Sequence, residues 1–263
     1  MSKLYPIGVF DSGVGGLSIL QEIRKLLPQE DFLYFADSAY CPYGGRPVEI
    51  IRNRAVAIGT FLQARGAKAM VVASNTTSAS GLESLRRELS IPVIGVEPAV
   101  KPAVQLSNSG KVGVLATGVT LRSSRFNSLL HRYCEGVEVL TQPCPGLVEA
   151  VESGDLDSAR PLLHTYLAPL LKQGVTLIVL GCTHYPFLRP IIAELCGPKV
   201  TIIDSGEAVA RQVMRVLDQF DLNALRSSGG IVQMFTSGDP VKVQPVVQLL
   251  WGDKDLTVER INL

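Results

Sequence analysis

The chain has 263 residues, 46% of them hydrophobic and 19% charged, so it can form one large domain or two ordinary ones with a sizeable core. A formal net charge of +1 argues against general binding to nucleic acid or to anionic membranes, which needs concentrated basic surface. No apolar stretch approaches the ~18 residues of a membrane span, and the first residues show no signal-peptide pattern. Five cysteines without a CxxC pair disfavour disulfides and a zinc site, so we expect a reduced, cytoplasmic protein without a metal.

The first predicted strand, residues 7–10, leads into a glycine-rich turn at 11–16 (DSGVGG) and a helix that begins near Leu17. Backbone N–H groups at such a turn favour an anionic group such as a carboxylate. The dinucleotide fingerprint GxGxxG is absent, and a tight turn that needs positive φ explains the glycines about equally well. Both interpretations therefore stay open.

A second strand, 32–36, ends at Asp37 and precedes the loop 41–47 (CPYGGRP), which has the composition of a loop that covers a pocket. Helical spacing of apolar residues predicts a helix over 49–65. The strand 70–73 follows and ends at Ser74. A helix from about 79 to 89 and a strand at 93–96 complete this part of the chain.

A second unit begins at 112–118 (VGVLATG), which matches 7–13 (IGVFDSG) position for position in apolar residues and glycines. The interval from Ile7 to Ser74 is 67 residues, and the interval from Val112 to Cys182 is 70. A glycine precedes each of the two later positions by eight residues, at 66 and at 174, which predicts a helix, a glycine cap, a buried strand and a reactive residue in each unit. This near-equal spacing indicates an internal duplication.

After Cys182 the sequence predicts a helix at 189–195, a strand at 200–203 and a long amphipathic helix at 207–220. Strand-like segments at 231–236 and 256–260 flank a helix at 241–250. Alternating strands and helices predict an α/β fold with two pseudo-symmetric parallel-sheet domains and a site in the cleft between them. We expect the first domain to comprise residues 1–96 and 208–263, and the second to comprise residues 97–207.

The two strand ends suggest a specific chemistry. Two thiols on opposite faces of a small molecule can invert a stereocentre, one removing a proton from carbon and the other returning it, without metal or cofactor. Asp11 and His184 are the candidate tuning groups. The candidates for holding substrate carboxylates are Ser12, Asn75, Thr76 and Thr183.

Five ordered motifs, at 11–16, 37–38, 42–44, 75–76 and 181–186, resemble those of bacterial glutamate racemases. The resemblance implies cofactor-independent interconversion of L- and D-glutamate, supply of D-glutamate for peptidoglycan, and a homodimer. It implies a substrate site lined by Asp11, Ser12, Tyr43, Gly44, Asn75, Thr76, Thr183 and His184, with Thr117 and Thr120 as a second set. Glu149 resembles a further position near that site, although it fits the start of a helix equally well.

One residue departs from the family pattern. Where the family carries its first catalytic cysteine, in a motif resembling Ala-Cys-Asn-Thr, this chain has Ser74. A hydroxyl is a far weaker acid than a thiol, whose pKa is about 8.5. We therefore expect intact binding and greatly reduced activity, because losing a positioned acid or base costs on the order of 10²–10⁴-fold. The surrounding motifs are kept, which favours an introduced change over natural divergence.

Three alternatives remain open from the sequence. In the first alternative, the chain is a racemase whose substrate is aspartate or a hydantoin. In the second alternative, the chain binds an acidic amino acid without turnover. The third is hydrolysis with Cys182 as nucleophile and His184 as base, which lacks an orienting third group in the sequence. We interpret the following residues as structural: His131, His164, Cys134, Cys144 and Cys196. Cys41 lies in the loop that covers the pocket, and nothing in the sequence assigns it chemistry.

Overall fold

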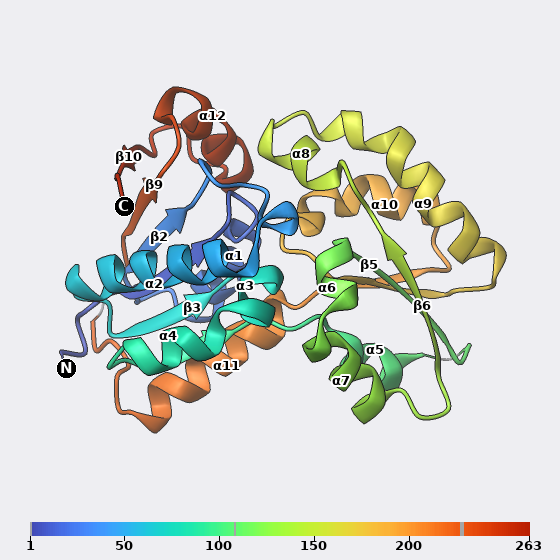
Figure 1. Ribbon diagram of the computed structural model, residues 1–263, viewed down its shortest axis with the longest axis horizontal. Helices are drawn as coiled ribbons and strands as arrows, with labels where there is room; N and C mark the ends of the chain where they lie inside the picture. The colour runs from blue at the N-terminus through green and yellow to red at the C-terminus, as the bar shows by residue number, and fades with distance from the viewer. Residues whose placement is uncertain (1, 108, 227–228) are drawn as a thin grey trace.

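The structure is a computed structural model that describes residues 2–107, 109–226 and 229–263, and its strands form two parallel sheets (Figure 1). The first sheet has the order β10-β9-β2-β1-β3-β4, with β1 (Ile7–Asp11), β2 (Phe32–Ala36), β3 (Ala69–Val72), β4 (Val93–Gly95), β9 (Val232–Thr236) and β10 (Val258–Arg260). The second has the order β6-β5-β7-β8, with β5 (Lys111–Ala116), β6 (Glu138–Pro143), β7 (Leu177–Leu180) and β8 (Thr201–Ile203). The predicted class, two α/β units with parallel sheets, is confirmed.

Helices cover both faces of the first sheet, which explains why its central strands are continuously apolar. Val9 and Phe10 are adjacent in β1, point to opposite faces, and are both fully buried. Phe10 packs in the cluster that includes α2 (Val48–Ala64) and α4 (Leu82–Glu88). Val9 packs in the cluster that includes α1 (Leu17–Leu26), α11 (Gly206–Gln219) and α12 (Pro240–Trp251).

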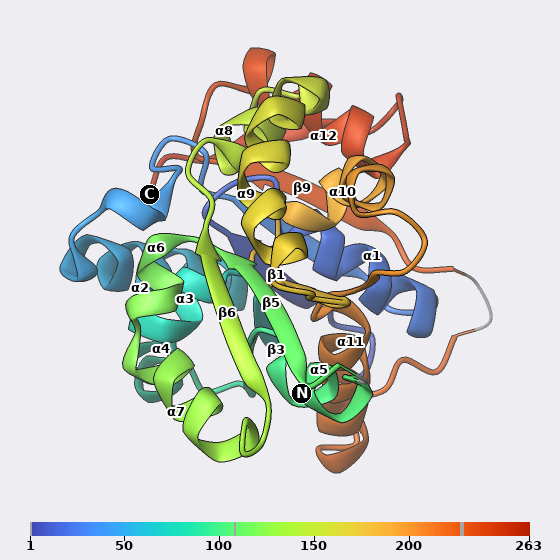
Figure 2. The ribbon, with the colours of Figure 1, turned by 90° about the vertical axis from the view of Figure 1, so that its right-hand side faces the viewer.

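The second sheet is covered in the same way. The helices α5 (Val100–Leu106) and α7 (Ser124–Tyr133) lie on one face, and α9 (Arg160–Lys172) and α10 (Arg189–Cys196) lie on the other (Figure 2). The remaining short elements are α3 (Asn75–Ser80), α6 (Gly118–Arg122), α8 (Leu147–Glu152), and the 3₁₀ turns η1 (Tyr43–Gly45), η2 (Leu156–Ala159) and η3 (Tyr185–Leu188).

The two units repeat one topology. The order β2-β1-β3-β4 in the first sheet corresponds to β6-β5-β7-β8 in the second. Gly66 and Gly174 have φ of +92° and +79°, and each donates its N–H to the carbonyl three residues back. The next residue in each case donates to the carbonyl five residues back, which completes a Schellman motif at the ends of α2 and α9. The predicted glycine caps are confirmed.

The strand glycines Gly8 and Gly113 also occupy equivalent places, in β1 and β5. A Cβ at Gly8 would crowd Ala67 and Met70, and a Cβ at Gly113 would crowd Val175 and Ile178. In each unit the first of these residues follows the glycine cap, and the second lies three positions further on, in the next strand. The repeated glycine is therefore a packing requirement, because only a residue without a side chain lets the returning segment approach its strand.

The chain crosses between the sheets twice, and the two crossings are joined. The first lies between β4 and α5, and the second between β8 and α11. Ser205 Oγ donates a hydrogen bond of 2.6 Å to the carbonyl oxygen of Glu97 across them. We propose these two connections as the boundaries of the two units.

One helix prediction is wrong. Residues 79–89 do not form one helix; α3 begins directly after Ser74, and α4 begins at Leu82 after a break at Gly81. The break is local, since Gly81 has non-helical ψ and its N–H donates to the carbonyl of Thr77. Over the described ranges of the chain, no helix combines the length and apolar character needed to cross a bilayer.

Candidate active site

A cavity of about 400 Å³ lies where the carboxyl ends of both sheets' central strands meet. Residues that follow β1 and β3 line it from the first unit, and residues that follow β5 and β7 line it from the second. It contains all ten residues predicted for the site: Asp11, Ser12, Tyr43, Gly44, Ser74, Asn75, Thr76, Cys182, Thr183 and His184. Thr117, Thr120 and Glu149 also line it.

Ser74 lies two residues after β3 and caps the next helix, α3. Its backbone is extended, and its Oγ accepts a hydrogen bond of 3.3 Å from Thr77 N–H at the start of α3. The side chain is buried, and so are those of Asn75 and Thr76. Among the described residues, Asn75 Oδ1 is one of the buried side-chain oxygens without a hydrogen-bond partner.

Cys182 occupies the equivalent position after β7. Its Sγ lies 3.6 Å from His184 Nδ1, and both side chains are buried. The turn is held by Tyr185 N–H, which donates to the carbonyl of Cys182 at the start of η3. The thiol and the imidazole are thus placed by backbone geometry rather than by a long flexible segment.

Asp11 connects the two units from the end of β1. Its Oδ1 accepts from Ser12 N–H at 2.6 Å, and its Oδ2 accepts from Thr183 Oγ1 at 2.9 Å. Burial raises the pKa of this carboxyl, and His184 and the hydrogen bonds from Ser12 and Thr183 oppose that rise. Asp11 is therefore a candidate proton carrier in the cavity.

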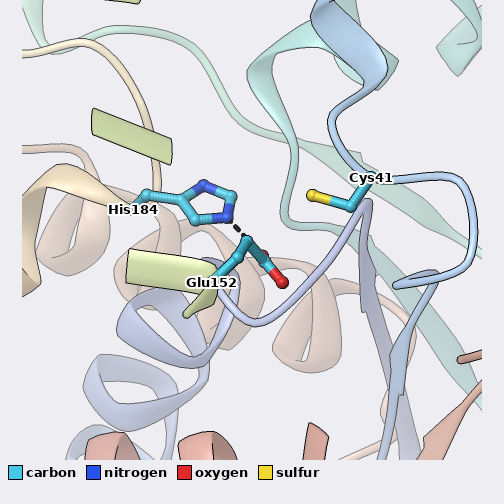
Figure 3. Close-up of side chains that lie close together, drawn as sticks. All are labelled: Cys41, Glu152 and His184. Atoms are coloured by element: carbon cyan, nitrogen blue, oxygen red, sulfur yellow. Dashed lines mark hydrogen bonds and ion pairs between the residues drawn. The ribbon is translucent and has the colours of Figure 1, made fainter. Parts of the chain in front are cut away.

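His184 is paired with a residue that the sequence did not reveal. Its Nε2 lies 2.6 Å from Glu152 Oε1 (Figure 3), and the same oxygen accepts from Val14 N–H at 2.7 Å. Burial lowers the pKa of His184, but contacts with Cys182, Cys41 and Glu152 outweigh burial and raise it well above 6.5. A protonated His184 places a positive charge beside the Cys182 sulfur, since the two atoms Nδ1 and Sγ are 3.6 Å apart.

The glycine-rich turn at 11–16 serves this pair. Val14 N–H does donate to a carboxylate, but this carboxylate belongs to Glu152 of the same chain. That the turn also holds a carboxylate of a bound substrate stays a prediction. The positive-φ interpretation is wrong, because none of its glycines has positive φ. Instead, a Cβ would lie 1.9 Å from Glu152 Oε1 at Gly13 and 2.3 Å from His184 Nδ1 at Gly15.

Tyr43 lines the cavity, but its hydroxyl is engaged elsewhere. The hydroxyl donates to Asp37 Oδ2, and Arg54 contacts both oxygens of the same carboxylate, with Nε at 3.0 Å and Nη2 at 2.6 Å. Burial and the Asp37 carboxylate raise the pKa of Tyr43 far above 10. Arg54 also donates to the carbonyl oxygen of Leu263 at 2.7 Å, so this network fixes η1 against the end of the chain.

Two further cysteines lie at the site. Cys144 lines the cavity, and Cys41 lies with Glu152 beside His184 (Figure 3). Burial raises the pKa of Cys41 to about 12, and burial likewise raises that of Cys144. Cys144 also packs in the hydrophobic core, as expected for a structural residue. Cys41, to which the sequence assigned no chemistry, lies beside the His184 ring. His131 and His164 lie on α7 and α9, outside the residues that line the cavity.

The sequence of this chain is similar to a family of known proteins. Residues 7–213 match the model of a family described as Asp/Glu/Hydantoin racemase. The chain belongs to the Asp/Glu/Hydantoin racemase family. It is 50% identical over 255 residues to the glutamate racemase of Pseudomonas paraeruginosa, covering 95% of both chains.

Solved structures of this racemase family agree with the fold. The Bacillus anthracis glutamate racemase isoform RacE1 superposes with a TM-score of 0.89 at 34% identity, covering 99% of this chain and 98% of that one. The glutamate racemase of Francisella tularensis in complex with D-glutamate gives 0.85 at 29% identity, covering 99% and 98%.

Proposed function

We propose that the chain is an isomerase that interconverts L- and D-glutamate by transferring the α-proton between two faces of the substrate. One observation carries the proposal: Ser74 and Cys182 follow equivalent strands of two different sheets and line the same cavity. The family match supports the reaction, and the D-glutamate complex of the Francisella relative supports the substrate. D-Glutamate made in this way supplies peptidoglycan synthesis.

The chemistry on the Cys182 side follows from its neighbours. Cys182 as a thiolate removes the α-proton of L-glutamate, and His184 balances the negative charge while Glu152 orients the ring through Nε2. The negative charge on the α-carbanion and on the substrate carboxylates needs hydrogen-bond donors in place of those that water supplies in solution. Ser12, Asn75, Thr76 and Thr183 line the cavity at the height of the strand ends and take that role.

On the other side, Ser74 limits the reaction. Its hydroxyl has the position of a base, and Thr77 N–H already donates to its oxygen. An alkoxide is nevertheless out of reach near neutral pH, since even the more acidic thiol has a pKa of about 8.5. Delivery of a proton from this face, and removal of the α-proton of D-glutamate, are therefore the impaired steps.

The Ser74→Cys variant tests the proposal. Racemisation of each enantiomer is followed by circular dichroism, and we expect a gain on the order of 10²–10⁴-fold over the unmodified chain. A Ser78→Cys variant is the matched control, because Ser78 lies one helical turn further along α3 and does not line the cavity. No gain in Ser74→Cys would contradict the two-base proposal.

Exchange of the α-proton in D₂O separates the two faces in the unmodified chain. L-Glutamate should exchange through Cys182, whereas D-glutamate should exchange far more slowly. Equal exchange of both enantiomers at the rate of Ser74→Cys would contradict the assignment of Ser74 as the impaired group.

Binding without turnover is the second candidate, and Ser74 is the observation that favours it. Calorimetric binding of D-glutamate with no exchange of either enantiomer would support this alternative. Parallel assays with aspartate and a hydantoin test the substrate, because the family description includes all three.

Hydrolysis is a third candidate, because the structure places Glu152 where the sequence showed no group to orient His184. Cys182, His184 and Glu152 form a connected series like that of a thiol hydrolase. The family match and the second strand end at Ser74 favour racemisation. An acyl-enzyme trapped on Cys182 by an activated ester would reverse this preference.

The oligomeric state and the cellular location of the chain are also part of the proposed function. We infer a homodimer in the cytoplasm, on the strength of the family resemblance and of five cysteines that the structure leaves unbridged. Sedimentation equilibrium over a range of concentrations tests the dimer, and fractionation of cells tests the location.

A further inference from the structure

His184 lines the first cavity and lies beside two residues that line a second one. Its Nδ1 edge faces Cys182 in the cavity described above, and its Nε2 edge faces Glu152. Cys41 and Glu152 line a separate cavity of about 560 Å³. Its wall carries charges of both signs, including Asp239 and Lys242. A solute in this second cavity therefore meets Cys41 and Glu152, the two residues that lie beside His184.

Three metal-binding groups converge at that point (Figure 3). One ligand atom from each of Cys41, Glu152 and His184 lies within 4.8 Å of the other two. Thiolate sulfur, imidazole nitrogen and carboxylate oxygen are all ligands that Zn²⁺ takes in proteins. His184 is buried, while Cys41 and Glu152 are partly exposed, which gives an ion a route in from solvent.

The distances require only small movements. Tetrahedral bonds of about 2.0 Å to nitrogen and oxygen and 2.3 Å to sulfur place nitrogen and oxygen about 3.3 Å apart, and nitrogen and sulfur about 3.5 Å apart. Glu152 Oε1 is now 2.6 Å from His184 Nε2, so it must withdraw by about 0.7 Å. Cys41 must approach by no more than about 1.3 Å, given its present limit of 4.8 Å.

The surroundings already hold these ligands in place. Val14 N–H donates to Glu152 Oε1 at 2.7 Å, which is the kind of outer hydrogen bond that orients a metal-binding carboxylate. The backbone of Gly15 lies against the His184 ring, where even a Cβ would be 2.3 Å from Nδ1. The two second-unit ligands are thus fixed against the glycine-rich turn before any ion arrives.

We propose that Cys41, His184 and Glu152 form an inhibitory site for Zn²⁺ or a similar thiophilic divalent cation, with solvent as a fourth ligand. Coordination displaces the proton of Cys41 Sγ, and any proton on His184 Nε2, to solvent. The ion then holds the imidazole through Nε2 and replaces its hydrogen bond to Glu152. The inhibitory effect rests on the proposed racemase function, whereas the binding does not.

Binding is tested with Cd²⁺ alone, whose thiolate complexes absorb in the ultraviolet. We expect the unmodified chain to bind one ion with this absorption, and Cys41→Ser to bind it at least about ten-fold more weakly. Cys134→Ser is the matched control, because Cys134 is also half-buried and unbridged but lies at the end of α7. It should bind as the unmodified chain does.

A second measurement needs no variant. Alkylation of Cys41 by iodoacetamide, mapped by mass spectrometry in the unmodified chain, should slow when Cd²⁺ is bound. Unchanged alkylation of Cys41, or unchanged Cd²⁺ absorption and affinity in Cys41→Ser, would overturn the site.

Inhibition is tested by exchange of the α-proton of L-glutamate in D₂O with added Zn²⁺, each variant relative to its own rate without metal. The loss of exchange should persist at high glutamate and should need at least about ten-fold more Zn²⁺ in Cys41→Ser. Binding without loss of exchange would overturn the inhibitory role. No exchange even without Zn²⁺ would instead count against the proposed function, and the Cd²⁺ measurements would still decide the site.

Discussion

Replacing Gly15 with alanine tests whether the glycine-rich turn positions His184. The new Cβ would lie 2.3 Å from His184 Nδ1, whereas ordinary contacts begin at 3.4 Å, so the ring or the turn must move by about 1.1 Å. Gly15 does not have positive φ, so its backbone accepts alanine and the effect arises from the ring. A misplacement of about 1 Å at a reacting centre costs on the order of 10²-fold in rate.

We therefore expect Gly15→Ala, made together with Ser74→Cys, to lose about 10²-fold in racemisation and about 1–3 kcal/mol in the free energy of unfolding. Circular dichroism gives the rate, and urea denaturation gives the stability. Gly45→Ala is the control, because Gly45 lines the same cavity, has no positive φ, and a Cβ there meets nothing within 4 Å. Racemisation within two-fold of the parent, or an equal loss in Gly45→Ala, would refute the reasoning.

Three other predictions concern stability. Glu152→Gln should destabilise the chain most below about pH 6.5, where the raised pKa of His184 contributes fully to stability. The difference in the free energy of unfolding between variant and parent should shrink as pH rises through the pKa of His184 in the folded state. A difference in urea denaturation that does not depend on pH would contradict this. Arg54→Met should cost about 3–5 kcal/mol, because it leaves the buried Asp37 charge unpaired, whereas the exposed Arg52→Met should cost under about 0.5 kcal/mol. Gly66→Ala and Gly174→Ala should each cost about 1–2 kcal/mol, since both caps have positive φ, and clearly unequal losses would argue against their equivalence.

The fold and the cavity follow from local patterns in the sequence. The central strands β1, β3, β5 and β7 are four to six residues long and mainly apolar, and each can be recognised within one short segment. The same holds for the glycine caps at 66 and 174 and for the reactive residues Ser74 and Cys182 that follow β3 and β7. Parallel sheets then bring the strand ends together, and for this reason Asp11, Ser74 and Cys182 could be predicted to share a site.

Partners that arrive from distant segments could not be read in this way. Glu152 is 32 residues from His184 and lies in the last turn of α8, where an acidic residue looks like ordinary helix surface. Arg54 reaches Asp37 from the middle of α2, and Cys41 reaches the imidazole from a loop. Their roles depend on the relative placement of elements, and the only local signal was the glycine-rich turn whose N–H groups needed an anion.

That turn also restricts what the protein can recognise. A glycine-rich connection between a strand and a helix often receives the phosphate of a nucleotide. Here the Glu152 carboxylate accepts from Val14 N–H and lies against Gly13, so the place for a foreign anion is filled from within. A phosphorylated metabolite would have to expel this carboxylate and separate it from His184. The Glu152 side chain therefore disfavours nucleotide binding at this turn, because it occupies the position that a phosphate would take.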